Sequence, residues 1–523
     1  MTTDQDSISF RRVGIVGSGA MGRGIAQLFA QAGVSVSLFD TNPAAVESAL
    51  RSLEGTFARL VEKGRLNEAD AQKARAALSP AASLESLADC DLVVEAIVER
   101  LDAKRSLFES LEKIVSESAV LATNTSSLSV TAIAADSTHP ERIAGLHFFN
   151  PVPLMKVVEV VRAARTADPV IERLQALVRA TGHLAVTTRD TPGFIVNHAG
   201  RGYGTEALAA LGEGVATIPE IDRILREQVS FDGRGFRLGP LELFDLTALD
   251  VSQPVMESIF RQFYDEPRFR PSVIAAQRLA AGLLGRKTNE GFYRYVDGTQ
   301  QQEAEPAAPA VAVRPPVWVA PGPWAERVAQ AARALGAVVR DTASPGPDEL
   351  ILVAPLGLDA SAATRAAARG DDGPDLPAER VVAIDALFPI EPGSCRRRVL
   401  MTTPATRAEY RDAAHAIFAS DGVPVTMLRD SPGFIAQRVI AMIVSIGSEI
   451  AQQRIATPTD IDGAVRAGLG YPLGPLSMGD ALGADTICTI LGNLNRLTGD
   501  PRYRIGGWLR RRAALGLSLL QED

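Results

Sequence analysis

The sequence predicts a chain in which one arrangement occurs twice: a doubly wound α/β sheet domain followed by an all-α domain, with a degenerate second copy. In the first 188 residues, apolar strand-like runs alternate with helical patterns, which is typical of a mostly parallel sheet covered by helices. A helical pattern then continues to Gly291, and the same order returns from Val317 onward. Two repeated motifs support the duplication.

Short buried runs mark the expected strands of the first sheet. They are Arg12–Val16, Val34–Phe39, Leu92–Ala96, Val120–Thr123, Ile143–Phe149 and Val157–Val161. A glycine-rich turn follows the first run, and a helix is expected from there to about Gln31. The segment Pro43–Leu78 is long, charged and helical in pattern, so it predicts a helical pair inserted into the sheet domain. The alternation of strand and helix predicts parallel strands.

Two motifs of the first half return in the second. RDTPGFIVN (189–197) returns as RDSPGFIAQ (429–437), and LGPLELFD (238–245) returns as LGPLSMGD (473–480). The offsets of 240 and 235 residues are nearly equal, which argues against chance similarity. The expected parts are a sheet domain (1–188), a helical domain (189–296), a linker rich in Pro, Ala, Gln and Glu (297–316), a degenerate sheet domain (317–428) and a second helical domain (429–523).

The composition disfavours several classes of function. Of 523 residues, 46% are hydrophobic and 22% charged, as in soluble globular proteins. The formal net charge is −8 and no Lys/Arg block interleaves with aromatic residues, so we expect no nucleic-acid partner. We also expect no signal peptide and no membrane-spanning run. Cys90, Cys395 and Cys488 lack the spacing of metal ligands, which predicts no metal, no disulfide framework and a cytoplasmic location.

A glycine motif, GSGAMG (17–22), follows the first strand and opens the first helix. Gly17 permits the tight turn, Gly19 lets the backbone approach a pyrophosphate, and Gly22 lets the helix pack close to the strand. The start of the helix favours the negative charge of the pyrophosphate. This is the Rossmann-type dinucleotide-binding pattern. The residues expected at the cofactor are Gly17, Gly19, Ala20, Met21 and Gly22.

Asp40 ends the second strand, 18 residues after Gly22, where an acid is expected to meet the hydroxyls of the adenosine ribose. Its charge favours NAD over NADP because it would repel a 2′-phosphate. The alternative is a glycine turn in a sheet that binds no nucleotide, with Asp40 as a solvated strand end. Because strand, motif, helix and acid occur together, we expect NAD as the cofactor.

An enzyme that oxidises an alcohol by hydride transfer needs a base for the hydroxyl proton, and histidine suits this task near neutral pH. The sequence has five histidines: His139, His147, His183, His198 and His415. His147 stands out because it lies in an apolar strand beyond the nucleotide-binding half of the sheet. The alternative from the pattern alone is a buried histidine with a structural role.

Four segments around His147 resemble the signature motifs of the 3-hydroxyacyl-CoA dehydrogenases. They are GLHFFNP (145–151), NTSS (124–127), VVEV (157–160) and PGFIVN (192–197). GRKTNEGFY (285–293) resembles the segment that closes this family's helical domain. The resemblance covers residues 12–295 closely and residues 317–510 as a degraded copy. One departure is His198, which stands where the family often has arginine.

The resemblance implies a role for each matching residue. His147 would be the general base, and Glu159 would hydrogen-bond the other imidazole nitrogen. Ser126 and Asn197 would hold the substrate hydroxyl and thioester oxygens. The residues implied at the cofactor or at the mouth of the site are Glu99, Lys104, Asn124 and Asn150. The pattern alone leaves plainer alternatives: a helix cap for Ser126, a strand-end charge for Glu159 and a solvated helix residue for Lys104.

The resemblance also implies the reaction, the NAD-dependent oxidation of an (S)-3-hydroxyacyl-CoA to the 3-oxoacyl-CoA. Two-copy chains of this length resemble the members that act on 3-hydroxyadipyl-CoA in phenylacetate breakdown. That substrate, in aromatic or fatty acid breakdown by β-oxidation, is the first expectation, and 3-hydroxybutyryl-CoA is the second. A non-catalytic NAD-binding protein is a further alternative, against which the intact set of His, Glu, Ser and Asn counts.

The second half is expected to bind no NAD. At a constant offset of 303 residues, the three motif glycines become Ala320, Gly322 and Ala325. Ala325 places a methyl group where helix and strand must approach closely, and Pro321 and Pro323 remove backbone donors that a phosphate would use.

The second half is also expected to carry no chemistry. His147, Glu159 and Asn197 correspond to Asp385, about Met401 and Gln437. In the family that the chain resembles, the helical domains form the dimer contact. We therefore expect either a monomer with an internal pseudo-dimer or a homo-oligomer.

Overall fold

The structure is a computed structural model that describes residues 10–312, 314–370 and 373–523. These residues form two compact units. The first contains the chain up to His198 together with a distant segment, Gln453–Leu469, and the second contains Ala199–Gln452 and Gly470–Gln521. The five domain ranges expected from the sequence stay a prediction, since the two units group the chain differently.

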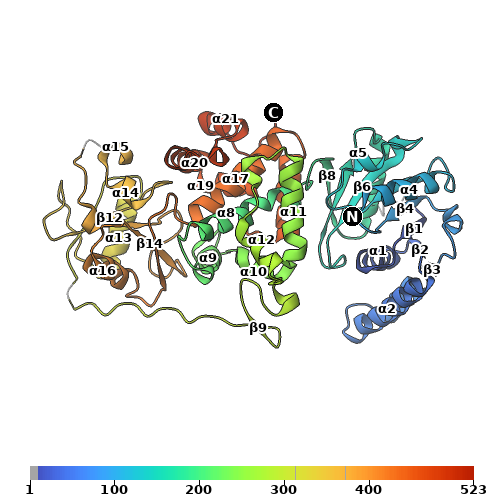
Figure 1. Ribbon diagram of the computed structural model, residues 1–523, viewed down its shortest axis with the longest axis horizontal. Coiled ribbons are helices and arrows are strands. Elements are labelled where there is room, and N and C mark those ends of the chain that lie inside the picture. The colour runs from blue at the N-terminus through green and yellow to red at the C-terminus, as the bar shows by residue number, and fades with distance from the viewer. Residues whose placement is uncertain (1–9, 313, 371–372) are drawn as a thin grey trace, which may run out of the picture. The chain divides into compact units, whose positions relative to one another are not determined.

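The first unit is built on an eight-stranded sheet (Figure 1). Its strands are β1 (Arg12–Val16), β2 (Ser35–Phe39), β3 (Leu78–Pro80), β4 (Leu92–Glu95), β5 (Val120–Thr123), β6 (Ile143–Phe148), β7 (Val157–Arg162) and β8 (Leu184–Arg189). Their order across the sheet is β3-β2-β1-β4-β5-β6-β7-β8. The six expected strands form close to their expected bounds, whereas β3 and β8 were not expected.

The expectation of a parallel sheet is wrong at one side. Strands β6 and β7 run antiparallel, with His147 opposite Glu159. Only residues 149–156 connect these strands, and a parallel crossover needs about a dozen residues or more, so the chain turns back directly. Strand β8 runs parallel to β7 because helix α6 (Asp168–Ala180) crosses between them.

Helices cover both faces of this sheet, as a doubly wound fold requires. They are α1 (Ala20–Gln31), α2 (Pro43–Glu62), α3 (Glu68–Ala76), α4 (Leu101–Glu112), α5 (Val130–Ile133) and α6. Successive residues of β4 enter different apolar clusters: Leu92 and Val94 join the cluster with α1 and α6, and Val93 joins the cluster with α4 and α5. The expected helical pair is confirmed as α2 and α3, whose first turns are capped by asparagine side chains.

The second unit begins with the helices of the first half. They are α8 (Arg201–Gly212), α9 (Ile218–Arg223), α10 (Pro240–Thr247), α11 (Leu249–Gln262) and α12 (Val273–Ala280), followed by the hairpin β9 (Tyr295–Val296) and β10 (Thr299–Gln300). The described residues between Gln300 and Val317 form neither helix nor strand, as the linker predicts. Glu305 of this stretch forms ion pairs with Arg223 and Arg397, so the linker is anchored.

A smaller sheet follows, with β11 (Val317–Val319), β12 (Leu350–Val353), β13 (Val381–Ile384), β14 (Arg398–Thr402) and β15 (Val425–Leu428) paired in chain order. The antiparallel pair β13–β14 repeats β6–β7. Strand β11 pairs directly with β12, whereas β4 separates β1 from β5 in the first sheet. After α13 (Ala325–Ala334), the described part of the second half keeps only an isolated bridge, Val317–Val339, at the place of β2. The outer nucleotide-binding strands are therefore reduced in this copy.

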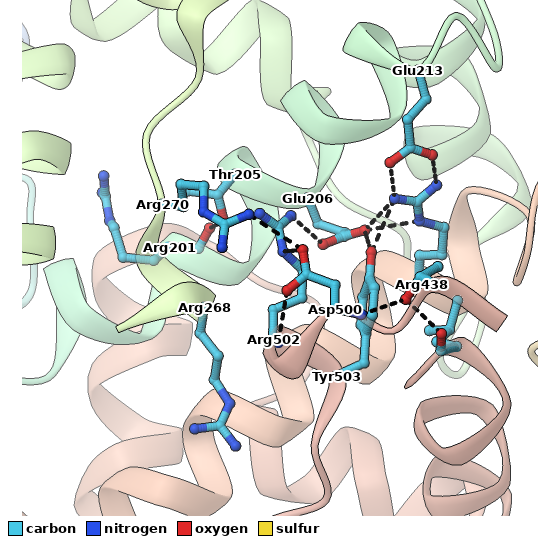
Figure 2. A network of polar contacts seen from close by, with 12 residues as sticks. Arg201, Thr205, Glu206, Glu213, Arg268, Arg270, Arg438, Asp500, Arg502 and Tyr503 are labelled. Atoms are coloured by element: carbon cyan, nitrogen blue, oxygen red, sulfur yellow. Dashed lines mark hydrogen bonds and ion pairs between the residues drawn. The ribbon is translucent and has the colours of Figure 1, made fainter. Parts of the chain in front are cut away.

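The remaining helices are α14 (Ala360–Ala363), α15 (Ala366–Arg369), α16 (Ala408–Phe418), α17 (Ala436–Gln452), α18 (Pro458–Leu469), α19 (Pro475–Leu482), α20 (Ala484–Thr498) and α21 (Gly507–Leu515). Helix α17 of the second half packs on α8 of the first within the second unit. Figure 2 shows the polar network at this contact, where Glu206 of α8 accepts hydrogen bonds from Arg438 of α17 and from Tyr503. In residues 10–312, 314–370 and 373–523, no helix is long and apolar enough to cross a membrane.

Candidate active site

The glycine turn between β1 and α1 has the geometry that its sequence predicts. Gly17 has a φ of +106°, and a Cβ there would lie 2.5 Å from a backbone oxygen just after β4. A Cβ on Gly22 would lie 1.8 Å from the carbonyl oxygen of Gly17, so only glycine fits. A Cβ on Gly19 would meet nothing within 4 Å, no side chain caps α1, and the first N–H groups of a helix have no partner within the helix. These features fit a bound pyrophosphate.

Asp40 follows β2 directly and lies beside this turn. Its Oδ2 accepts hydrogen bonds from the backbone N–H (2.9 Å) and hydroxyl (2.8 Å) of Ser18, and its Oδ1 accepts one from the N–H of Asn42. Burial would raise the pKa of Asp40, but these donors more than offset it and hold the pKa below the usual value. A carboxylate that stays ionised here fits a ribose diol and repels a 2′-phosphate.

His147 and Glu159 face each other across the antiparallel strands β6 and β7. The His147 Nδ1 lies 2.6 Å from Glu159 Oε2, and the two residues are only 4% and 0% exposed. The other carboxylate oxygen, Oε1, accepts hydrogen bonds from the backbone N–H groups of Ile195 (2.9 Å) and Val196 (2.8 Å). Glu159 is therefore no strand-end charge, because both of its oxygens are used inside the fold.

The surroundings of His147 limit how its ring can move. The rings of Phe149 and Phe194 lie 4.3 and 5.6 Å from it between centroids. The side-chain oxygen of Asn124 accepts a hydrogen bond from the backbone N–H of Phe148, the residue after His147, at 2.8 Å. Asn124 thereby ties the end of β5 to the strand that carries the histidine.

Lys104 is not the solvated helix residue that its charge allows, because its side chain is 1% exposed. Its Nζ lies 2.6 Å from Glu95 Oε1 and 3.1 Å from Glu99 Oε2. Glu95 is a site residue that the sequence analysis missed, although a charge inside the apolar run LVVEA was its signal. The pair Lys104–Glu95 joins α4 to the end of β4, which borders the glycine turn.

Glu99 organises the loop that contains Ser126. Its Oε1 accepts hydrogen bonds from the hydroxyl of Thr125 (2.6 Å) and from the backbone N–H groups of Ser126 (3.0 Å) and Ser127 (3.1 Å). Burial would raise the pKa of Glu99, but the Lys104 ammonium and the loop donors together lower it below the usual value. Glu99 therefore stays charged and holds the loop.

Ser126 is not the cap of the following helix, because Ser129 caps α5 through the N–H of Ala132. Asp190 binds the same helix start: its carboxylate accepts hydrogen bonds from the Ser129 hydroxyl (2.7 Å) and from two backbone N–H groups of α5. This role of Asp190 was not predicted, although the same aspartate occurs in both copies of the motif, RDTPGF (189–194) and RDSPGF (429–434). Asn197 follows Val196, one of the residues that hold Glu159, while Asn150 is exposed after β6.

The second half has lost this arrangement. Asp385 stands where His147 stood, and its N–H bonds to the carbonyl of Val399. The residue equivalent to Glu159 is therefore Val399 and not Met401, a correction that follows from the register of β13 and β14. Gln437, equivalent to Asn197, donates to Asp385 at 2.9 Å, so side chains of the chain itself fill the former site.

Comparison with known proteins identifies two families of domain. The model described as "3-hydroxyacyl-CoA dehydrogenase, NAD binding domain" matches residues 12–191. The model described as "3-hydroxyacyl-CoA dehydrogenase, C-terminal domain" matches residues 193–295 and again residues 433–518. The repeated match agrees with the duplication expected from the sequence.

Individual relatives cover the chain to different extents. The 3-hydroxyadipyl-CoA dehydrogenase of Escherichia coli (strain K12) is 36% identical over 511 residues, 97% of this chain and 98% of that one. A probable 3-hydroxybutyryl-CoA dehydrogenase of Bacillus subtilis is 37% identical over 292 residues, 56% of this chain and all of that one. A crystal structure titled 3-hydroxybutyryl-CoA dehydrogenase from Escherichia coli K12 superposes with a TM-score of 0.81 at 34% identity, covering 97% of this chain and 99% of that one.

These matches agree with the site geometry. The glycine turn and Asp40 fit a dinucleotide, and the buried pair His147–Glu159 fits proton abstraction from an alcohol. With the NAD-binding domain matched once and the C-terminal domain matched twice, this chain belongs to the 3-hydroxyacyl-CoA dehydrogenase family and is an NAD-dependent enzyme.

Proposed function

We propose that the enzyme oxidises an (S)-3-hydroxyacyl-CoA to the 3-oxoacyl-CoA with His147 as the general base. One observation carries this proposal: the buried His147 ring is bound by a carboxylate, and two backbone N–H groups hold that carboxylate in place. A histidine with only a structural role needs no such second layer of support. A non-catalytic protein would have no use for a base oriented in this way.

The hydrogen bonds support one arrangement of the protons in this pair. With the Glu159 carboxylate as acceptor, Nδ1 of His147 would donate to it, and Nε2 would be left with its lone pair. Nε2 would take the proton of the substrate hydroxyl, and Glu159 would stabilise the resulting imidazolium. Glu159 cannot turn away during this step, because the N–H groups of Ile195 and Val196 hold its other oxygen.

NAD, when bound, supplies the acceptor for the hydride that leaves C3 of the substrate. The glycine turn would hold its pyrophosphate, and Asp40 its ribose. Ser126 and Asn197 would bind the hydroxyl and thioester oxygens of the substrate. The residues proposed near the nicotinamide half or the mouth of the site are Glu99, Lys104, Asn124 and Asn150.

For the acyl group, we propose 3-hydroxyadipyl-CoA, in aromatic or fatty acid breakdown. The support is the relative of that name, which matches the present chain along nearly its whole length, duplication included. 3-Hydroxybutyryl-CoA is the second candidate, because the superposed crystal structure and the half-length relatives carry that name.

The test is NADH formation with a panel of (S)-3-hydroxyacyl-CoA thioesters that includes the adipyl and butyryl forms. We expect turnover of both, with a higher kcat/KM for the adipyl form, and the (R)-enantiomers serve as matched controls. A higher kcat/KM for the butyryl form would replace the proposed substrate. Binding of NAD without turnover of any thioester would favour the non-catalytic alternative.

Calorimetric titration is expected to give one NAD site per chain. Among its described residues, the second half keeps only the Val317–Val339 bridge at the place of the strand that carries Asp40 in the first half, and α13 starts at Ala325, the counterpart of the tightly packed Gly22. The Gly22→Val variant should bind no NAD, because its side chain would collide with the Gly17 oxygen. Two sites in the parent enzyme, or one remaining site in this variant, would contradict a non-binding second half.

Two further proposals concern location and assembly. We place the enzyme in the cytoplasm, supported by three cysteine thiols that form no disulfide among the described residues. We also propose a monomer with an internal pseudo-dimer, supported by the packing of α17 on α8. A homo-oligomer is the alternative, and light scattering of the full chain distinguishes the two.

A further inference from the structure

A segment of the second half completes the first unit. Gln453–Leu469, which contains α18, belongs to the unit of the first sheet. The backbone N–H of Arg189, at the end of β8, donates to the carbonyl of Ile455 at 2.8 Å. The N–H of Thr187 in β8 donates to the Asp460 carboxylate at 3.4 Å. The edge strand β8 is thus hydrogen-bonded to a segment that lies more than 250 residues later in the sequence.

The same contact occurs in the second unit with the halves reversed. There the N–H of Arg429 donates to the carbonyl of Val215 at 3.2 Å, and both residues are displaced by 240 positions from their equivalents in the first contact. Each half therefore lends the equivalent segment to the sheet of the other. A site on the first sheet is packed against residues that the first half does not supply.

Helix α18 reaches the groups that hold the catalytic carboxylate. A Cβ built on Gly468 would lie 3.0 Å from both γ-methyl carbons of Val196 and 3.4 Å from one of Val157. The backbone N–H of Val196 is one of the two donors to Glu159, and Val157 lies two residues before Glu159 in β7. Gly468 thus packs directly behind the support of the His147–Glu159 pair.

Val196 has little freedom to avoid a larger neighbour. It is 1% exposed, and both branches of its side chain face Gly468 at the same distance. A β-branched side chain is stiff about χ1, and every staggered rotamer of Val196 would still direct at least one methyl group toward Gly468. A methyl group on residue 468 would therefore require Val196 to give way by a few tenths of an ångström, and we expect this to shift the N–H group that donates to Glu159.

The first half differs at the equivalent position. Gln228, 240 residues before Gly468, lies against Asp385 of the second sheet, where the histidine has been lost. A glycine faces the sheet that keeps the His–Glu pair, and a larger side chain faces the sheet without it. This asymmetry is expected if space behind the carboxylate matters only where catalysis takes place.

We propose that Gly468 is a positioning residue for the reaction: α18 of the second half fixes the backbone that orients Glu159 and, through it, His147. The proposal rests on the proposed function of that pair. It gives the catalytically silent half a direct part in the chemistry of the first half, beyond stabilising the fold.

The test compares Gly468→Ala with Gly463→Ala in the full-length enzyme. Both replacements lie in α18 and add the same methyl group; the gain in helix propensity is about 1 kcal/mol at Gly463, inside the helix, and smaller at Gly468, one residue before its end. The Gly463 methyl group meets only the end of Leu184, a flexible side chain that is 42% exposed. We expect Gly463→Ala to keep the parent kcat, KM and NAD affinity.

Gly468→Ala should lower kcat about tenfold, and Gly468→Val up to about 100-fold, as a misplaced catalytic group of this kind does. NAD affinity of Gly468→Ala should match that of Gly463→Ala, and its midpoint of thermal unfolding should remain well above the assay temperature. In a Glu159→Gln background, Gly468→Ala should cause no further loss, because the support it disturbs no longer matters.

Parent-like kcat in Gly468→Ala would overturn the positioning role, as would an equal loss of kcat in both backgrounds. A drop in unfolding midpoint with unchanged kcat would make the contact purely structural. None of these results touches the proposed function itself, which fails only if the parent enzyme turns over no thioester or if its histidine proves dispensable.

Discussion

Replacing His147 with glutamine is expected to lower kcat by about 10²–10⁴-fold, the contribution of a positioned general base. Glutamine keeps an amide that can donate to Glu159, so the buried carboxylate retains a partner. It offers no lone pair basic enough to take the hydroxyl proton. NAD binding should be unchanged, because the glycine turn and Asp40 lie on other strands of the sheet.

His183→Gln is the matched control for this variant. His183 is a second buried histidine of the same sheet unit, and its ring bonds to the carbonyl of Val152 and to Thr181. Burial lowers its pKa, and the partners that its ring has among the described residues are a carbonyl group and a threonine, not a carboxylate. We expect this variant to keep kcat within about threefold of the parent, well short of a general-base effect. A loss below tenfold in His147→Gln, measured by NADH formation under saturating substrate, would show that His147 is not the base.

Local sequence patterns predicted the parts of the fold whose causes are local. The glycine turn requires glycine at Gly17 and Gly22 because of contacts within a few residues and with the next strand, and such requirements are visible in a motif. The helical pair α2–α3 was visible for the same reason, since capping residues and helical periodicity lie inside the segment.

Features that depend on distant pairing were not predictable in this way. The only sequence signal for the antiparallel pairing of β6 and β7 was the short connection between them. The alternation of strands and helices elsewhere in this half favoured a parallel arrangement instead. The burial of Lys104 against Glu95 was hidden because a charge on an amphipathic helix usually faces water. The placement of α18 in the first unit left no local signal, because the residues it contacts lie more than 250 positions earlier.

The duplication helps to separate structural from chemical residues. Asp190 binds the start of α5 and Asp430 binds the start of α14, so this contact is present in both halves. His147 and Glu159 became Asp385 and Val399 in the half without the cofactor motif. The contact at the helix start is thus present in both halves, whereas the pair that we propose for hydride transfer is replaced in the second.

Glu206→Ala is expected to lower the free energy of unfolding by about 3–5 kcal/mol, the usual cost of leaving buried charge without its partner. Glu206 is 0% exposed, and its carboxylate accepts from Arg438 (2.8 Å) and Tyr503 (2.6 Å) and lies 3.4 Å from Arg502 (Figure 2). Removing it leaves two guanidinium groups close together inside the contact between α8 and α17. Urea unfolding of the full chain measures the loss.

Glu213→Ala is the matched control, because Glu213 also pairs with Arg438 but is 50% exposed. The Glu213 carboxylate is half-exposed and its removal leaves the buried Arg438 paired with Glu206, so this variant should lose less stability than Glu206→Ala. Equal losses in the two variants, or a loss below about 1 kcal/mol in Glu206→Ala, would show that the network is not needed to hold the two halves together.

The difference between the parent and Glu206→Ala should also depend on pH. Burial would raise the pKa of Glu206, but Arg438 and Arg502 more than offset it, so the pKa in the folded protein lies below the usual 4.5. A depressed pKa contributes stability that is fully present above the unfolded value and is lost as the pH falls through the folded one. The stability gap should therefore be constant near neutral pH and shrink below about pH 4. A gap that stays constant down to the acid unfolding transition would mean that the carboxylate charge contributes nothing and that only packing is lost.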